Sequence, residues 1–294
     1  MKTFNNALNN KDFCISSEIF LRPETDERLI KDQADILRDS VDAILIPDNQ
    51  SGQVHMSSLS AGILLKKAKI DPIVQLSCRN RNRISLISDL LGCAALGIEN
   101  VMLIRGDKVP LDVQPRPKAV LDINATELIA LANKIKQDEL FPNLNHLLLG
   151  CVVTPISPKK GWPAKNLTKR VDSGAQLITT HTCLDMDIIK NYTERLVETK
   201  LLRRMHLIIG IAILKSSADA KWLRENRPNV NIPFEIIKRL DNSKDPNLEG
   251  IKICAEQLKM LSKIPGVSGA HIIAANTITN IPEAVRLSGI SELS

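Results

Sequence analysis

The sequence predicts a single-domain α/β fold of the (β/α)8 or TIM barrel type, on three observations. Short β-rich runs alternate with amphipathic helical stretches along all 294 residues. Runs such as residues 101–104 and 207–214 are almost continuously apolar, which is typical of parallel strands covered on both faces. Eight strand–helix units in a chain of this length match a barrel. An open doubly wound sheet is less well matched, because the glycine-rich phosphate-binding motifs common in such sheets are missing.

The pattern of apolar residues gives the position of each element in order. Gly97 is expected to cap the end of one helix and Asn124 the start of the next. The domain is expected to cover residues 1–294, with a helical insertion around 217–265 before the last strand. The predicted strands are residues 13–20, 43–47, 73–78, 100–105, 146–153, 176–182, 206–214 and 268–275. The predicted helices are residues 27–39, 56–69, 84–96, 125–137, 186–203, 219–226, 234–240 and 248–264.

Composition excludes several classes of protein. No apolar run approaches the roughly 20 residues that span a bilayer, and the polar start lacks a secretory signal, so a soluble cytoplasmic protein without a membrane partner is expected. The net charge of +6 is spread along the chain without a nucleic-acid-reading motif, so no nucleic-acid partner is expected. Six cysteines without a C-x-x-C pair fit a reducing compartment.

Aromatic residues are scarce, at five Phe, two Trp and one Tyr. Planar ligands are commonly held by aromatic side chains. Any planar ligand of this chain is therefore expected to lie on aliphatic surface or on another ligand.

Barrel enzymes work at the carboxyl ends of their strands, so the candidate site residues can be read from the predicted strand ends. They comprise carboxylates, amides, cations and one imidazole, which are expected to converge at one rim. These residues are Glu18, Asp48, Asn49, Gln50, Cys78, Arg79, Asn80, Arg105, Gly106, Asp107, Thr154, His181, Asp185, Lys215, Ser216 and Asn276.

Glu18 is the most informative of these residues, because it lies within the apolar run of residues 16–20. Burial of a carboxylate is costly unless it is paired or protonated, and desolvation raises its pKa toward the range of a general acid at neutral pH. A structural salt bridge at a strand end is the alternative role, and the residues alone leave both open.

Asp107 follows Arg105 and Gly106, where the glycine would let the backbone approach a ligand or simply turn the chain. His181 and Cys183 share one face of the sixth strand, which is compatible with a metal site completed from other strands. Buried structural Cys and His are commoner than ligands, so no metal site is predicted.

Several motifs resemble the methylenetetrahydrofolate reductase family. The central block runs from Gln75 through the segment Leu90-Leu-Gly-Cys-Ala-Ala-Leu-Gly-Ile98 to Asn100-Val-Met-Leu-Ile-Arg-Gly-Asp107. The likeness extends to Ser17-Glu-Ile-Phe20, to Asn49-Gln-Ser-Gly52 and to Lys169-Arg-Val-Asp-Ser-Gly-Ala175. It covers most of the chain in the right order.

The resemblance implies a barrel, often homo-oligomeric, that binds FAD and reduces 5,10-methylenetetrahydrofolate to 5-methyltetrahydrofolate with NAD(P)H as donor. It implies that Glu18 is the acid that opens the five-membered ring, and that Asp107 lies beside the flavin or pterin. Cofactor-binding residues by this resemblance are Asn49, Gln50, Ser51, Cys78, Arg105, Gly106, Asn166, Lys169 and Arg170. Candidate substrate-binding residues at the later strand ends are His181, Lys215 and Asn276.

The chain departs from the family pattern where the family contacts flavin, nicotinamide or folate. A tyrosine-proline-glutamate segment is replaced by Val153-Thr-Pro-Ile-Ser-Pro158, and a glutamine followed by aromatics becomes His181-Thr-Cys-Leu184. The aromatic-rich end of the eighth strand becomes Ile273-Ala-Ala-Asn276 without an arginine. Two alternatives follow: a flavin-free folate-binding paralogue acting in direct hydride transfer or demethylation, and a non-catalytic partner barrel.

Overall fold

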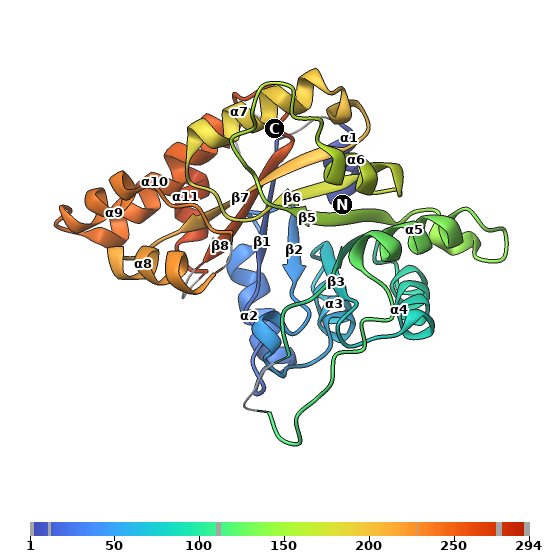
Figure 1. Cartoon of the computed structure of the whole chain (residues 1–294). Coiled ribbons are helices and arrows are strands. Elements are labelled where there is room, and N and C mark those ends of the chain that lie inside the picture. The colour runs from blue at the N-terminus through green and yellow to red at the C-terminus, as the bar shows by residue number, and fades with distance from the viewer. Residues whose placement is uncertain (1–2, 11–12, 110–112, 228, 275–277, 291–294) are drawn as a thin grey trace.

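Eight parallel strands form a closed barrel in the computed structural model, in the order β1 to β8, and β1 pairs with β8 (Figure 1). The predicted TIM barrel is confirmed. The structure describes residues 3–10, 13–109, 113–227, 229–274 and 278–290. The strands are β1 (Cys14–Glu18), β2 (Ala43–Ile46), β3 (Pro72–Ser77), β4 (Asn100–Ile104), β5 (Leu148–Val153), β6 (Leu177–Thr180), β7 (His206–Ile213) and β8 (Gly269–Ala274).

The helices surround the barrel, and most begin at a side-chain cap. Asn124 forms the capping box of α5, as the sequence predicts, and Gly97 follows α4 with a positive φ of 68°. The helices are α1 (Phe4–Asn9), α2 (Glu27–Leu37), α3 (Ser58–Lys67), α4 (Arg83–Ala95), α5 (Ala125–Lys136), α6 (Lys165–Asp172), α7 (Met186–Glu198), α8 (Ser217–Asn226), α9 (Phe234–Asp241), α10 (Pro246–Leu261) and α11 (Ile281–Ser288).

The structure corrects the predicted helices at several points. Helices α1, α6 and α11 were not predicted. The predicted helix over 186–203 ends at Glu198, because Lys200 adopts a left-handed conformation with φ 62° before a short 3-10 turn, Leu201–Arg203. Between β7 and β8 lie α8, α9 and α10, of which α10 packs on both strands. No helix in the described ranges is long and apolar enough to cross a membrane.

Most of the hydrophobic core lies between the strands and the outer helices, and a second, smaller cluster fills the amino end of the barrel interior. The smaller cluster joins Phe4 and Leu8 of α1 to strand residues such as Leu45 and Met102. Helix α1 therefore closes the amino end of the barrel. Within the barrel interior, the buried carboxyl of Glu18 lies toward the other, carboxyl end.

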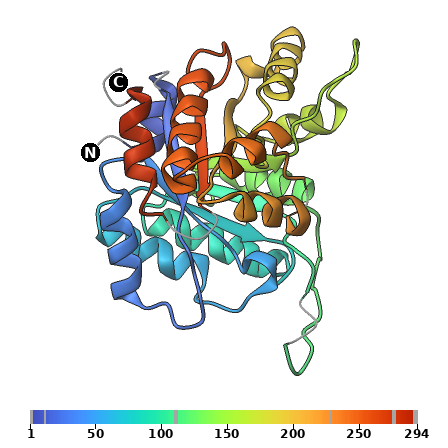
Figure 2. The ribbon, with the colours of Figure 1, turned by 90° about the vertical axis from the view of Figure 1, so that its left-hand side faces the viewer.

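Asp71 fastens α1 to the barrel. Its buried carboxylate accepts the backbone N–H of Phe4 at 2.9 Å and the side-chain amide of Asn100 at 3.1 Å. After β4, the described residues 105–109 and 113–124 extend away from the barrel in both ribbon views (Figures 1 and 2). The two ends of the barrel therefore differ: one is sealed by apolar packing and the other carries long connections.

We expect Phe4→Ala to lower the free energy of unfolding by about 3 kcal/mol, because it empties a fully buried position beneath the barrel. Urea unfolding followed by circular dichroism measures this change. Asn6→Ala is the matched control on the same helix, since Asn6 is exposed. Equal stabilities of the two variants would contradict the role of α1 as a seal.

Candidate active site

Glu18 is the last residue of β1, and its carboxyl lies inside the carboxyl end of the barrel. Residues alternate along a strand, so Glu18 shares the inner face with Cys14, which belongs to the interior cluster. The residue is only 6% exposed. Burial raises the pKa of Glu18 to about 6, against the positive charge of Arg227 and a hydrogen bond from the side chain of Gln50. The carboxyl is therefore poised between its acid and base forms near neutral pH.

A second polar pair lies one layer deeper in the barrel. Ser16 Oγ and His271 Nδ1 are 3.0 Å apart, and both residues face inward from the paired strands β1 and β8. Burial lowers the pKa of His271 to about 4, so the imidazole is neutral at physiological pH. The floor beneath Glu18 is thus polar but uncharged.

Residues 49–52, called the 49–52 loop below, follow β2 and fold over Glu18. Asn49 and Ser51 have positive φ angles of 51° and 55°, which is unusual for residues other than glycine. Asn49 accepts a hydrogen bond from Asn80 at 3.1 Å and donates to the carbonyl of Gln53 at 2.8 Å. These contacts compensate the strain of the backbone, and strain of this kind is concentrated at functional sites.

Asp107 holds the 49–52 loop from the end of β4. Its Oδ2 accepts the backbone N–H of Ser51 at 2.6 Å. Gly106 brings this segment close to Arg79, because a Cβ at Gly106 would lie 2.8 Å from the Arg79 Cβ. The buried guanidinium of Arg79 in turn donates to the backbone carbonyls of Asp48 at 3.2 Å and Asp107 at 3.4 Å.

A buried ion pair supports the loop from below. Asp48 accepts from Arg81 Nη1 at 2.5 Å and from the backbone N–H of Ser77 at 2.8 Å, and Arg81 also pairs with Asp89 at 2.6 Å. Because both groups are largely desolvated, loss of either one would leave a buried charge without its partner. The ends of β2 and β3 are therefore locked together beside the site.

His181 and Arg170 complete the described rim on the side of β5 and β6. Burial lowers the pKa of His181, while the charge of Asp107 opposes this shift and that of Arg170 adds to it. Arg170 also donates to the backbone carbonyl of Val152. The structure thus brings Glu18, Asp107 and His181, three of the predicted site residues, to one end of the barrel.

Other predicted site residues lie elsewhere. Cys78 packs in the hydrophobic layer between strands and helices, where burial raises its pKa to about 11. The reason is the alternation along the strand, which turns Cys78 outward while Ser77 faces in. Arg105 is exposed. Lys215 is half-buried beside α8, where its backbone N–H donates to Asp219.

Two further predicted residues lie on α6, the helix that also carries Arg170. Asn166 and Lys169 are exposed and make no side-chain hydrogen bond or ion pair within the described part of the chain. Asn276 lies outside the described residues. The assignment of these residues to a cofactor or substrate stays a prediction.

Sequence reasoning missed Arg227 and the Ser16–His271 pair. Ser16 stands two residues before Glu18, so strand alternation alone would have placed it on the inner face. Arg227 carries no such signal, because it ends a helix that is remote in sequence and reaches the site only through the fold. Its Nη1 donates to Ser51 Oγ at 3.4 Å.

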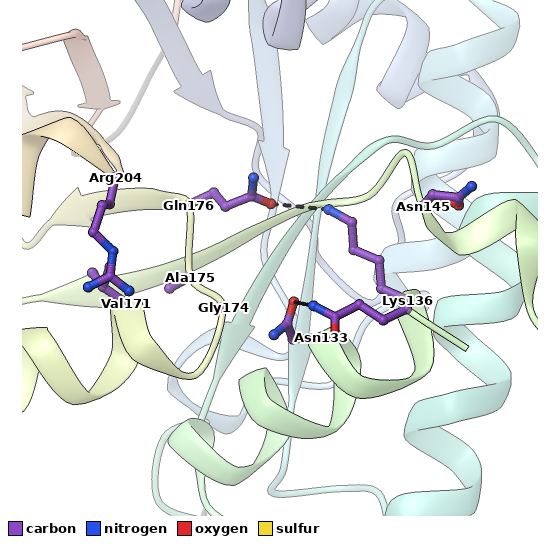
Figure 3. A pocket seen from close by; sticks show the side chains of 9 residues that line it. Asn133, Lys136, Asn145, Val171, Gly174, Ala175, Gln176 and Arg204 are labelled. Carbon is purple, nitrogen blue, oxygen red and sulfur yellow. Dashed lines mark hydrogen bonds between the residues drawn. The ribbon is translucent and has the colours of Figure 1, made fainter. Parts of the chain in front are cut away.

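Two open cavities, of about 440 and 430 Å³, lie at the opposite, amino end of the barrel. Both are lined by Lys136, Asn145 and Gln176 (Figure 3). Lys136 crosses from α5 and donates to the carbonyl of Leu147 at 2.6 Å and to Gln176 at 3.1 Å. Through these contacts Lys136 joins α5 to the segments that lead into β5 and β6. Among the residues the structure describes, no cluster of His, Cys, Asp and Glu is suited to hold a metal ion.

Comparison with known families identifies the family of this chain. The profile described as methylenetetrahydrofolate reductase matches residues 3–289, nearly the whole chain. This chain belongs to the methylenetetrahydrofolate reductase family. No curated protein sequence gives a significant match to it.

Solved structures similar to this family member share its fold. One is an uncharacterised protein from Clostridium thermocellum that binds two copies of 5-methyl-5,6,7,8-tetrahydrofolic acid; it is 14% identical, with a TM-score of 0.68 over 99% of each chain. EDTA monooxygenase from Chelativorans sp. is 10% identical, with a TM-score of 0.55 over 96% of this chain and 93% of that one. Tryptophan synthase from M. tuberculosis is 12% identical, with a TM-score of 0.50 over 99% and 95%. At these identities the likeness supports the barrel alone.

The close approach at Gly106 gives a stability prediction. Gly106 and Gly161 both have positive φ, 87° and 81°, but a Cβ at Gly161 meets nothing within 4 Å. We expect Gly161→Ala to cost about 1 kcal/mol for the left-handed backbone. Gly106→Ala should cost about 2 kcal/mol more, because of overpacking against Arg79 and Ser77. Chemical denaturation of both variants measures the difference, and equal losses would show that the contact is unimportant.

The burial of Glu18 gives a second prediction, on pH. The pKa of Glu18 is about 6 in the folded chain and 4.5 in its ordinary state. The free energy of unfolding is therefore highest below pH 4.5, where Glu18 is neutral in both states, and it falls as the pH rises through 6 and the buried carboxyl ionises. Glu18→Gln removes this loss and should stabilise the protein by about 2 kcal/mol at pH 8. The gain should vanish at pH 4. Thermal unfolding across this range is the measurement, and a variant less stable at pH 8 would contradict the burial cost.

Proposed function

We propose that this protein binds a reduced folate at the carboxyl end of the barrel and acts on the one-carbon unit attached to it, with Glu18 as the proton donor. The observation that carries the proposal is a buried carboxyl group at the end of β1 whose pKa is raised to about 6. Membership of the methylenetetrahydrofolate reductase family supports a folate ligand. The related C. thermocellum structure, which binds 5-methyltetrahydrofolate, supports the same ligand class.

Glu18 suits the step in which the methylene bridge of 5,10-methylenetetrahydrofolate opens. The bond from the methylene carbon to N10 breaks, N10 keeps the electron pair and takes the proton, and the carbon remains on N5 as an iminium group. Roughly a tenth of Glu18 is protonated at pH 7 when its pKa is about 6. A general acid of this strength is matched to neutral pH and typically contributes 10²–10⁴-fold to the rate.

A more specific proposal is the flavin-dependent reductase activity that the sequence resemblance implies. In it the iminium group is reduced to 5-methyltetrahydrofolate by hydride that originates in NAD(P)H and passes through FAD. The chain would then be a methylenetetrahydrofolate reductase in the strict sense. This form requires a flavin site made by the residues that the resemblance assigns to it.

The residues present do not fit a flavin well. In the 49–52 loop, Gln50 bonds Glu18 and the backbone of Ser51 bonds Asp107, so their polar groups already have protein partners. Arg170 is engaged by the carbonyl of Val152. Nearby aromatic side chains turn outward: Phe20 packs in the outer core, and Trp162 lies against Tyr192, with ring centroids 5.8 Å apart. We derive no step through FAD.

This mismatch favours a second candidate, a flavin-free folate enzyme of the same family. In it the folate meets Glu18 and Asp107 directly. The one-carbon unit is then either reduced by hydride from a nicotinamide or moved in a methyl-transfer or demethylation reaction. Such an enzyme needs the acid and the electrostatic partner but no stacking surface, which matches the residues present.

The test begins with the visible absorption spectrum of freshly purified protein, followed by acid release of any chromophore. We expect colourless protein that takes up no added FAD but binds 5-methyltetrahydrofolate in isothermal titration calorimetry. A yellow protein that releases FAD would support the flavin-dependent reductase instead. No folate binding at all would refute the proposed function.

Glu18→Gln then separates binding from chemistry. The variant should bind the folate with little change and lose about 10²–10⁴-fold in turnover of the methylene substrate, since it cannot donate a proton. In the wild type, kcat/KM should fall as the pH rises above about 6, where Glu18 loses its proton. An unchanged rate in the variant would remove Glu18 from the mechanism.

A further inference from the structure

Arg227 reaches the site from an element that no motif connects with it. It is the residue directly after α8, in the segment between β7 and β8. Its side chain is half-buried and donates from Nη1 to the hydroxyl of Ser51 at 3.4 Å. Within the described ranges, no carboxylate forms an ion pair with it. A half-buried guanidinium whose hydrogen bond within the described residues goes to a neutral hydroxyl calls for a further explanation.

Ser51 stands between Arg227 and the carboxylate of Asp107. The Ser51 hydroxyl accepts from Arg227, while its backbone N–H donates to Asp107 Oδ2 at 2.6 Å. The 49–52 loop is therefore held from two sides, by a cation after α8 and an anion after β4. Two residues of this loop with positive φ, Asn49 and Ser51, cost about 1–3 kcal/mol each, so the loop depends on such external contacts.

Gln50 is the neighbour of Ser51 in the same loop, and its side chain bonds Glu18. A rigid loop fixes the direction of that hydrogen bond, and a loose loop would not. Contacts thus run without a break from Arg227 through Ser51 and Gln50 to Glu18.

We propose that Arg227 is a positioning residue of this site, which fixes the 49–52 loop over Glu18 and stabilises the ionised form of that carboxyl group. The proposal rests on the function proposed above and adds a residue to it. An acid that acts repeatedly must lose its proton as well as hold it. A buried carboxyl with no cation near it would keep its proton to a higher pH.

The other groups around Glu18 do not supply this charge. From β8, His271 is neutral because burial lowers its pKa to about 4. From the end of β6, burial lowers the pKa of His181. From the end of β4, Asp107 brings a carboxylate rather than a cation. After burial, the charge of Arg227 is the strongest influence on the pKa of Glu18, and it acts in the opposite direction.

The experiment is a pH titration of the unliganded protein carrying 13C in the glutamate carboxyl groups, followed by NMR. Glu18→Gln assigns the Glu18 signal. In Arg227→Gln, we expect the midpoint of Glu18 to move up by about one pH unit, because the opposite charge is gone. Arg227→Lys keeps the charge and should restore most of the shift. Arg224→Gln is the matched control, since Arg224 is an exposed cation on α8.

A second readout reports on the loop itself. Hydrogen exchange at residues 49–52 should become faster in Arg227→Gln and stay slow in the Arg224→Gln control. If Arg227→Gln does not fold, Ser51→Ala tests the same link, because it removes the acceptor of Arg227 and leaves the Ser51 backbone bond to Asp107. It should speed exchange in the loop and shift Glu18 in the same direction.

An unchanged Glu18 midpoint in Arg227→Gln would overturn the proposal. An equal shift of the Glu18 midpoint in Arg224→Gln would also overturn it, because the shift would then come from the loss of any nearby surface charge and not from Arg227 in particular. The titration uses no folate, so its result is independent of folate binding. A wild-type protein that fails to bind folate but shows the Arg227 shift would refute the proposed function and leave the positioning role intact.

Discussion

Parallel hydrogen bonds between β1 and β8 close the sheet, with Ser16 paired to His271 and Ser17 to Ile272. Closure has a directional consequence, because all eight strands then deliver their carboxyl ends to the same rim. Segments far apart in sequence, at the ends of β1, β2, β4 and β6, meet there. Closure also creates an interior that side chains must fill, and the side chains that fill it differ between the two ends of the barrel. Apolar packing by α1 seals one end, and polar side chains occupy the other.

The burial of Glu18 at the carboxyl end affects both the stability of the fold and the pKa of this group. A buried carboxyl destabilises the fold at neutral pH, yet the same burial gives Glu18 the proton affinity of an acid. Hydrogen bonding from Gln50 and the charge of Arg227 moderate this cost without removing it. A structural salt bridge, the alternative role, would need a direct ion pair, and the described residues give Glu18 none. Within those residues, a structural salt bridge therefore does not account for the buried carboxyl.

The sequence predicted the barrel well because the strands are strong local signals: continuous apolar runs bounded by turns and capped helices. It also located Glu18 and Asp107, since strand ends follow from strand positions. It misplaced Cys78 because a shift of one residue at a strand end reverses the face of the sheet. It missed Arg227 because the contact of Arg227 with Ser51 depends on how the chain runs from β7 into α8. No local sequence pattern predicts the direction of that segment. Short helices such as α1 were missed because one or two turns give too little periodicity.

The state of the 49–52 loop bears on how a ligand would enter. The loop lies over Glu18, and several of its polar groups have partners inside the protein. A folate that approaches Glu18 must therefore replace some of these pairs with its own donors and acceptors. Because Asn49 and Ser51 already hold strained backbone angles, part of the cost of moving the loop is returned when they relax. Binding at this site would thus exchange internal hydrogen bonds of the loop for bonds to the ligand.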